Sequence, residues 1–430
     1  MDTRTNNVSL GDLQGIVGEA NAREASGTDT IDGVQPSFVA EPGSVENLSA
    51  LMKFANDAGL TVSPRGGGTS TALGNPPRDI DLVVSTARMN EVVEHVPGDQ
   101  VVRAGAGLKL RDLQERLAGS DQMLAVDPPE RGAGATVGGV VASNSSGPRR
   151  YRYGTIRDLI IGITVVLPDG TVAKAGGKVV KNVAGYDLGK LFTGSLGTLG
   201  VIANANFRLH PRPEAARTVA VELADTATAG QAVQTVMHSQ LVPSAVELHW
   251  GEGAKLLTIL VEGIPPAVEA QAETANHLLK GFGETRTLSD EEADNLGPLS
   301  PPGGPGAGDE VSLKISFPPA ELTGVLDSTL GACSRKGLDV PRMTGQAATG
   351  IVYAGLSGGD EDGLVAVTEE LREIWVRRGG SVVVREAPVS FKGRVEVWGP
   401  MGTRLELTRR LKEKFDPRGI MNPGRFVGGI

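Results

Sequence analysis

The chain has 430 residues, enough for two or three domains, and 40% of them are apolar, so it can bury a large core. Lys and Arg number 42 against 51 Asp and Glu, and the net charge of −9 argues against a protein that binds nucleic acid or an anionic membrane. The one cysteine, Cys333, rules out an internal disulfide and suits a reducing compartment.

The N-terminal residues Met1–Asn7 lead into no apolar stretch. The longest apolar run, Leu159–Leu167, is far shorter than the roughly 20 residues that span a bilayer. We therefore expect no signal peptide, no transmembrane helix and a cytoplasmic protein.

A strand, a helix and a second strand are predicted near the N-terminus. Phe38–Ala40 is a strand candidate, and Ser44 is a suitable N-cap for a helix whose apolar residues recur at steps of three and four. Gly59 stands where a left-handed glycine ends a helix. The strand Leu60–Val62 then runs into a glycine-rich loop, residues 64–74.

More strands follow in the next hundred residues. Ile80–Val84 and the segment 101–107 are predicted strands, and leucines at steps of three and four predict a helix closed by Gly119. Residues 168–170, Pro-Asp-Gly, are typical of a hairpin turn after the apolar run Leu159–Leu167. Val201–Leu209 is a further strand.

The composition changes near residue 214, where strand-like and helix-like stretches begin to alternate. This alternation predicts an α+β layer with an antiparallel or mixed sheet. The predicted strands are Thr218–Leu223, Leu257–Val261, Val311–Phe317, Ile351–Ala354 and Ser381–Arg385, and the predicted helices are Ala227–Met237, Ala267–Leu279, Ala320–Cys333 and Asp362–Arg378. Residues 297–309 are predicted to be an exposed loop, and Leu405–Phe415 a final amphipathic helix.

Three blocks of small residues carry the functional signal: 64–74, 128–148 and 181–202. In the first, consecutive glycines leave backbone N–H groups free to converge on an anion such as a diphosphate. The alternative is a flexible surface turn. The block is neither a Walker loop nor a Rossmann fingerprint, because the required spacings are missing. Small residues in all three favour a flat, extended ligand lying on backbone.

These blocks, with the C-terminal stretch Phe415–Phe426, resemble the FAD-linked oxidases, the superfamily of vanillyl-alcohol oxidase with a PCMH-type FAD-binding domain. Ala142–Gly154 and Lys181–Leu188 are most similar to the FAD-binding E subunit of bacterial glycolate oxidase. The resemblance implies an α+β fold with a PCMH-type FAD-binding domain of two α/β subdomains and a mixed-sheet cap. The implied boundaries are a segment 1–30, the FAD-binding domain 31–213, the cap 214–390 and a segment 391–430 that returns to the FAD-binding domain.

The resemblance also implies which residues hold FAD. The first loop would bind the diphosphate, the second block the flavin and ribityl chain, residues 200–202 the adenine end, and Asn422 would lie near the isoalloxazine. The implied cofactor-binding residues are Pro64, Arg65, Gly66, Gly67, Gly68, Thr69, Ser70, Pro129, Thr136, Gly138, Gly139, Ser143, Asn144, Gly200, Val201, Ile202 and Asn422. Relatives with covalent flavin have a His or a Cys at two attachment places. Thr69 occupies the first here and no Cys the second, so we expect noncovalent FAD.

Catalytic residues are harder to find in the sequence. Relatives that oxidise D-2-hydroxy acids carry an H-x-G-D-G-N-x-H metal motif, which this chain lacks, and no metal site is expected. Glu247 and His249 would share one face of a strand and are the candidates for a substrate contact, the alternative being a half-buried strand edge. The other histidines are expected at the surface.

Arginines are the candidates for binding the substrate anion. The arginines at 149, 150 and 152 are expected to form a solvated basic loop or a phosphate or subunit contact, the alternative being substrate-anion binding. Arg342, Arg385 and Arg394 cannot be ranked.

The resemblance implies an FAD-dependent oxidoreductase acting on CH–OH donors, as a subunit of a glycolate oxidase (dehydrogenase) complex. Its implied partners are a second FAD-binding subunit and an iron–sulfur subunit, through which the chain would associate at most peripherally with the inner face of the membrane. Two alternatives remain: a self-sufficient oxidase or dehydrogenase of another alcohol or sugar acid, and a flavin-binding structural subunit without a redox role.

Overall fold

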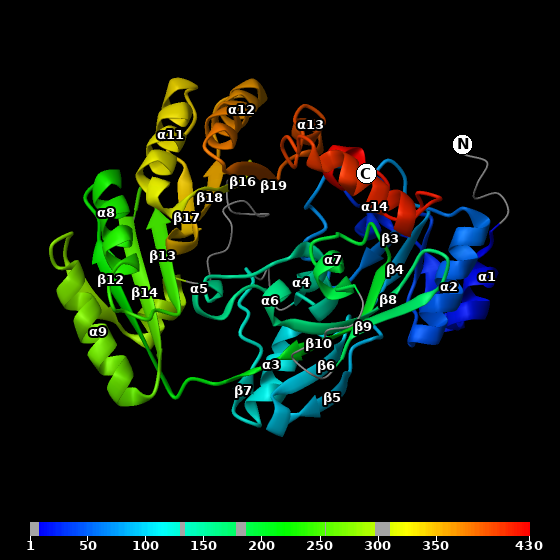
Figure 1. The fold of residues 1–430 in the computed structure, drawn as a ribbon. Helices are drawn as coiled ribbons and strands as arrows, with labels where there is room; N and C mark the ends of the chain where they lie inside the picture. The colour runs from blue at the N-terminus through cyan, green and yellow to red at the C-terminus, as the bar shows by residue number, and fades with distance from the viewer. Residues whose placement is uncertain (1–7, 130–133, 178–185, 254, 297–309) are drawn as a thin grey trace.

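A computed structural model describes residues 8–129, 134–177, 186–253, 255–296 and 310–430. They form an N-terminal region with three sheets and a cap with one large sheet (Figure 1). The loop 297–309, the start Met1–Asn7 and part of the block 181–202 lie outside the described residues. Within the described ranges, no helix is long and apolar enough to cross a membrane.

The first sheet carries the glycine loop at the end of its edge strand. Its strands are β1 (Ala22–Glu24), β2 (Phe38–Ala40), β3 (Val62–Arg65) and β4 (Leu82–Ser85), in the order β1-β2-β4-β3 with only β1 antiparallel. Its helices are α1 (Leu10–Val17) and α2 (Val45–Ala58). The ends of α2 are as predicted: Ser44 Oγ accepts from the N–H of Asn47, and Gly59 has φ 74°.

The second sheet is antiparallel and lies behind the second block of small residues. Its strands are β5 (Val92–Val96), β6 (Val101–Gly105), β8 (Ile160–Val166), β9 (Val172–Gly176) and β10 (Val201–Arg208), in the order β5-β6-β10-β8-β9. A small pair joins β7 (Gln122–Met123) to β11 (His210–Pro211). The helices of this part are α3 (Leu110–Ala118), α4 (Val137–Ser143), α5 (Arg150–Tyr153), α6 (Ile156–Leu159) and α7 (Leu188–Phe192). The antiparallel pairing of β8 with β9 confirms the predicted hairpin.

The cap contains the same strand–helix arrangement twice. The first half is β12 (Ala215–Glu222), α8 (Thr226–Met237), β13 (Ala245–Trp250), β14 (Lys255–Gly263), α9 (Pro265–Leu279) and β15 (Thr285–Leu288), followed by α10 (Asp290–Leu296). The second half is β16 (Val311–Ser316), α11 (Leu322–Arg335), β17 (Arg342–Gln346), β18 (Ile351–Leu356), α12 (Glu361–Arg377) and β19 (Ser381–Glu386). The sheet order is β15-β12-β14-β13-β17-β18-β16-β19, so each half is a ferredoxin-like β-α-β-β-α-β unit and the two join through β13 and β17.

The α+β fold class is confirmed, with one correction. The cap sheet was expected to be mixed, but every pair of neighbouring strands described in it is antiparallel. The sheet is antiparallel because of the ferredoxin-like connections. Each helix carries the chain over one strand to a position two strands away, so two strands joined by a helix are never neighbours in the sheet. The apolar pattern also does not mark the short strands β15 and β17, which have few buried apolar residues of their own.

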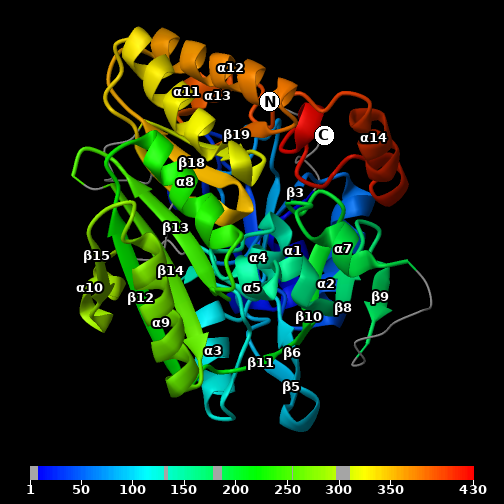
Figure 2. The same ribbon diagram turned by 60° about the vertical axis from the view of Figure 1, so that its left-hand side comes forward.

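One face of the cap sheet packs on helices and the other faces the N-terminal region. Alternate strand residues such as Val246, Leu248 and Leu313 join the helices in an apolar core. Figures 1 and 2 show α8, α9, α11 and α12 on the outer face of the sheet and α5 on the inner side. The residues between the core positions therefore point toward the N-terminal region.

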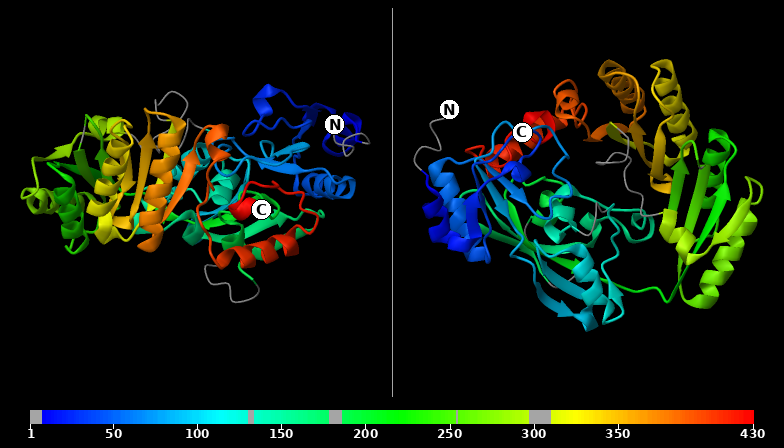
Figure 3. Two further views of the ribbon diagram at one scale, coloured as in Figure 1. Left: turned by 90° about the horizontal axis from the view of Figure 1, so that it is seen from above. Right: turned by 180° about the vertical axis from the view of Figure 1, so that it is seen from behind.

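The C-terminal segment returns to the first sheet. After α13 (Val389–Lys392) and α14 (Arg404–Phe415), the chain runs beside β3, where the Val62 N–H donates to the Ile420 carbonyl at 2.7 Å and the Asn422 N–H to the Val62 carbonyl at 2.8 Å. Seen from above, this segment lies over the N-terminal region and not over the cap (Figure 3).

Candidate functional site

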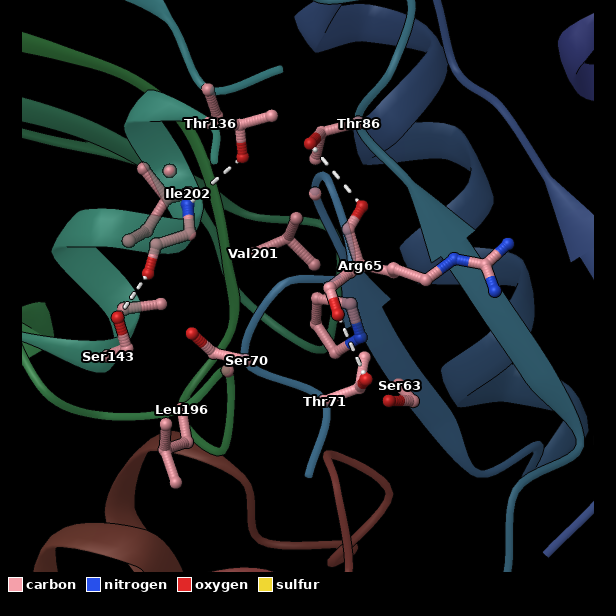
Figure 4. Close-up of a pocket in the computed structure, with 18 of the residues that line it drawn as sticks. Ser63, Arg65, Ser70, Thr71, Thr86, Thr136, Ser143, Leu196, Val201 and Ile202 are labelled. Carbon is pink, nitrogen blue, oxygen red and sulfur yellow. Dashed lines mark hydrogen bonds between the residues drawn. The ribbon is translucent and has the colours of Figure 1, made fainter. Parts of the chain in front are cut away.

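A pocket opens where β3, β6, β10, α4 and the C-terminal segment meet (Figure 4). The predicted cofactor residues that line it are Pro64, Arg65, Gly66, Gly67, Gly68, Thr69, Ser70, Thr136, Gly138, Gly139, Ser143, Gly200, Val201, Ile202 and Asn422. Asn144 does not line it, because it is the exposed, left-handed C-cap of α4, and Pro129 lines a smaller cavity alongside. Residues not predicted also line the pocket: Ile31, Ser63, Thr71, Thr86, Ala106, Ala142, Leu196, Gly197 and Arg425. Of these, Thr71, Ala142, Leu196 and Gly197 lie within the three blocks and Arg425 within the C-terminal stretch, so a sequence signal existed for them; Ile31, Ser63, Thr86 and Ala106 had none.

The glycine loop presents a row of unused backbone donors. Among the described residues, the amide N–H groups of residues 66–70 have no hydrogen-bond acceptor. The loop is also tightly packed: a Cβ on Gly66 would lie 2.2 Å from Thr136 Oγ1, and one on Gly67 would lie 1.6 Å from the carbonyl oxygen of Gly134. This packing rules out a loose surface turn. Five consecutive donors without acceptors among the described residues fit the diphosphate of the expected FAD.

A buried ion network holds the far side of this loop. The Lys392 Nζ donates to both carboxylate oxygens of Asp32 at 3.0 Å and to the Ala72 carbonyl at 2.6 Å. Arg425 donates to Asp32 at 2.8 Å and to the carbonyls of Thr71 and Leu73 at 2.6 Å. One carboxylate thus serves two buried cations, which leaves net positive charge at the pocket wall.

Asn422 offers an unused acceptor inside the pocket. Its Nδ2 donates to the Leu196 carbonyl at 2.6 Å, while Oδ1 is buried and has no donor among the described residues. Its backbone is left-handed, with φ 45°, a conformation that Asn tolerates better than most residues. An unsatisfied buried oxygen at the pocket wall fits a bound group that carries an N–H, as the flavin ring does.

A row of polar side chains crosses the inner face of the cap sheet. The strand register places His249 opposite Thr344, Thr344 opposite Tyr353, and Tyr353 opposite Lys314. Glu247 lies opposite Gln346 in the neighbouring row. Directly opposed side chains of adjacent strands lie close enough to contact one another.

Several of these groups have displaced pKa values because they are buried. Burial raises the pKa of Glu247 to about 8, helped by the nearby charge of Asp127, whose own pKa burial raises to about 7. Burial lowers the pKa of His249 to about 4, so its imidazole is neutral at physiological pH, and its Nε2 has no partner among the described residues. Burial and the charges of Arg385 and Arg150 lower the pKa of Lys314 to about 7. Such shifts are typical of functional sites.

The arginines after the second block do not form a solvated loop. Arg149 makes an ion pair at 2.6 Å with Glu262, whose side chain is 1% exposed, and Arg152 donates to the Glu262 carbonyl at 2.7 Å. Both therefore tie the N-terminal region to strand β14 of the cap. The sequence could not show this because the partners lie more than 100 residues apart.

The remaining histidines and the cysteine are outside the pocket. His238 and His277 are exposed as expected, but His95 and His210 are partly buried: His95 Nε2 lies 2.9 Å from Gln122 Oε1, and His210 packs on Tyr153. Cys333 is buried in the apolar core of the cap. Among the described residues there is no group of three or more His, Cys, Asp or Glu side chains that could hold a metal ion.

Comparison with known proteins agrees with this geometry. Residues 36–176 match the model of an FAD binding domain, and residues 212–296 and 400–426 that of the C-terminal domain of FAD linked oxidases. The chain is 30% identical to D-lactate dehydrogenase of Archaeoglobus fulgidus over 410 residues, 90% of this chain and 91% of the relative. It is 25% identical to glycolate oxidase subunit GlcD of Bacillus subtilis, over 91% and 89% of the two chains, and 33% identical to subunit GlcE of Escherichia coli, over 52% and 63%. The fold is similar to that of p-cresol methylhydroxylase, with a TM-score of 0.77, 17% identity, and coverage of 99% and 97%.

The two-part fold and the pocket define an FAD-binding oxidoreductase. The chain belongs to the FAD-linked oxidases, with a PCMH-type FAD-binding region and a cap. Bound FAD supplies the two-electron acceptor of this family's chemistry, and the residues of the glycine loop and Asn422 are those that would hold it.

Proposed function

We propose that this chain is the FAD-carrying subunit of a complex that oxidises glycolate or a related 2-hydroxy acid. The observation that carries the proposal is a smaller cavity that shares Thr69 and Ser70 with the larger pocket. Its polar lining consists of Thr69, Ser70, Ser145, Arg385 and Glu386. A small acid there would lie between the cofactor and a cation of the cap. The similarity to glycolate oxidase subunits GlcD and GlcE supports the substrate class and the subunit role.

The position of His249 supports the proposal that partner subunits are needed for catalysis. A hydroxy acid loses its hydroxyl proton to a base, and that base must lie within hydrogen-bond reach. His249 lies three strand positions from Lys314 along the cap row, about 14 Å at the usual spacing of strands. A small acid beside Lys314 cannot reach His249. We propose that a second flavin subunit contributes the proton acceptor and an iron–sulfur subunit receives the electrons, with at most peripheral membrane association through them.

One observation favours a second candidate, a self-sufficient dehydrogenase of a 2-hydroxy acid. Burial lowers the pKa of Lys314 to about 7, so its neutral amine can accept a proton, and the hydroxyl of Tyr353 lies directly opposite it. The near-full-length similarity to a D-lactate dehydrogenase also supports the self-sufficient dehydrogenase.

Stopped-flow reduction of the flavin separates the two candidates. The full chain loaded with FAD is mixed with glycolate or D-lactate, alone and after co-expression with the partner subunits. The subunit proposal expects slow reduction by the lone chain, because general-base help is worth roughly 10²- to 10⁴-fold in rate, and fast reduction in the complex. Fast reduction by the lone chain that is lost in Tyr353→Phe supports the self-sufficient enzyme, and no reduction by either acid in any preparation refutes both.

A further inference from the structure

Helix α14 differs from the other long helices in both charge and burial. It contains five Lys or Arg and two Glu, which gives it a net charge of +3, whereas the whole chain carries −9. Among the described helices of eight or more residues, α14 alone has a net positive charge and alone has no buried residue. A positive surface on an otherwise acidic chain favours the binding of an anionic partner.

Most cations on the outer face of α14 lack an anionic partner. This outer face consists of the exposed residues Arg404, Glu406, Leu407, Arg409, Arg410, Glu413 and Lys414. Arg410 pairs with Glu406. Arg404, Arg409 and Lys414 form no ion pair with a described residue. The outer face of α14 therefore keeps positive charge that its own carboxylates do not neutralise.

The apolar side of α14 is already packed against its own chain. Leu405 contacts the C-terminal segment, where a Cβ on Gly428 would lie 2.5 Å from Leu405 Cδ1. Phe415 packs edge-on against Phe192 of α7, with ring centroids 6.0 Å apart. Of the large apolar residues of α14, Leu407 is the one left exposed, at 63%. Because a helix that binds a membrane inserts a broad apolar face into the lipid, α14 fits an acidic protein surface better than a membrane.

One layer of backbone separates α14 from the FAD pocket. The Lys412 Nζ donates to the carbonyl oxygens of Thr198 at 2.8 Å and Met421 at 2.7 Å. Gly197 precedes Thr198 and Asn422 follows Met421, and both of these neighbours line the pocket. Figures 1 and 3 show α14 over the N-terminal region and not over the cap sheet. A protein bound to α14 would thus lie close to the cofactor and leave the cap side free for substrate.

We propose that the outer face of α14 docks the electron-accepting subunit of the complex, through an acidic face of that subunit. This inference rests on the proposed function, which includes an iron–sulfur partner. The partner would take the two electrons of each FADH2 one at a time on its iron–sulfur group, while two protons pass to water and FAD is restored. Opposite charges speed and orient such an encounter, and salt screens them.

Two small one-electron oxidants of opposite charge probe the outer face without a partner. The full chain loaded with FAD is reduced with one equivalent of dithionite, and its reoxidation by anionic ferricyanide and by cationic hexaammineruthenium(III) is followed by stopped flow. In the double variant Arg409→Glu with Lys414→Glu, ferricyanide should react about 10-fold more slowly and the ruthenium complex faster, because charge steers association. Added salt should reduce both effects. Damage to the FAD pocket would instead change both rates in the same direction.

The matched control is the double variant Arg116→Glu with Lys280→Glu. It makes the same change of charge at exposed positions in α3 and at the end of α9, and Figure 1 shows both helices apart from α14. Both oxidation rates should remain as in the wild type. Docking is then measured as capture of the co-expressed iron–sulfur subunit by the tagged full chain. The α14 variant should capture about 10-fold less of this subunit, and the control should capture as much as the wild type.

The outcomes separate this inference from the proposed function. No capture of the iron–sulfur subunit by the wild type, unchanged capture by the α14 variant, or equal rates in the α14 variant and the control overturns the inference, even if glycolate reduces the flavin. If the α14 variant does not hold FAD, Arg409→Gln with Lys414→Gln decides, and unchanged rates with both oxidants overturn the inference. Charge-dependent binding to phosphatidylglycerol vesicles without capture of the subunit assigns the face to a membrane and overturns it. Opposite rate changes and lost capture, without flavin reduction by glycolate or D-lactate in any preparation, support the docking face and refute the proposed function.

Discussion

Replacing Asp32 with Asn should destabilise the glycine loop and weaken FAD binding. Among the described residues, Asp32 is the carboxylate that pairs with both Lys392 and Arg425, whose side chains are 0% and 6% exposed. The amide of Asn has almost the same shape but no charge, so it leaves two buried cations without compensation. Removing one partner of a buried ion pair costs about 3–5 kcal/mol. Because both cations also bind carbonyls of residues 71–73, the loss falls on the loop that lines the pocket.

The assay combines urea unfolding of the FAD-free chain with FAD titration. We expect Asp32→Asn to lower the free energy of unfolding by about 3–5 kcal/mol and to raise the dissociation constant of FAD. Asp57→Asn is the matched control, because the Lys53–Asp57 pair is exposed, at 67% and 61%, and such pairs contribute about 0–1 kcal/mol. Adding Lys392→Met to Asp32→Asn removes one of the unpaired cations and should recover part of the stability. A change below about 1 kcal/mol in Asp32→Asn, with normal FAD affinity, would refute the role of this network.

Three further results are expected. Acid precipitation should release all the flavin into the supernatant, because Thr69 stands where relatives carry a histidine for covalent attachment; yellow colour in the pellet would contradict this. Gly67→Val should abolish FAD binding, because the added Cβ would lie 1.6 Å from the Gly134 carbonyl oxygen and the side chain would also obstruct the diphosphate. Gly98→Ala is the control and should bind FAD normally, because a Cβ there meets nothing within 4 Å. Equal FAD content in the two variants would count against the loop assignment. Burial raises the pKa of Glu247 to about 8 in the folded chain, against about 4 when unfolded, so the folded state holds an extra proton between these values and the free energy of unfolding should fall as pH rises from about 4 to about 8. Urea unfolding at pH 5, 6.5 and 8 should show that the free energy of unfolding declines less steeply with pH in Glu247→Gln than in the wild type. An identical decline in both proteins would refute the raised pKa of Glu247.

Sequence patterns were informative wherever the determining contacts are local. The helix from Ser44 to Gly59 was predicted at both ends because a hydroxyl cap and a left-handed glycine act within one turn of the helix. The glycine loop was predicted for the same reason. Consecutive glycines widen the range of backbone conformations, and this effect does not depend on the residues that pack around them. Arg149 and Arg152 were misinterpreted because their partners, Glu262 and the Ser244 hydroxyl, belong to the cap and lie far away in the sequence.

The amino-acid sequence by itself thus determined the local elements, the glycine-rich blocks and, through their resemblance, the FAD-linked oxidase family. Only the tertiary structure decided how the cap presents its polar groups. Lys314, Tyr353 and Arg385 lie tens of residues apart in the chain, and the antiparallel register of β18, β16 and β19 brings them together. The lowered pKa of Lys314 arises from its burial, and burial is a property of the packed fold that no short stretch of sequence contains.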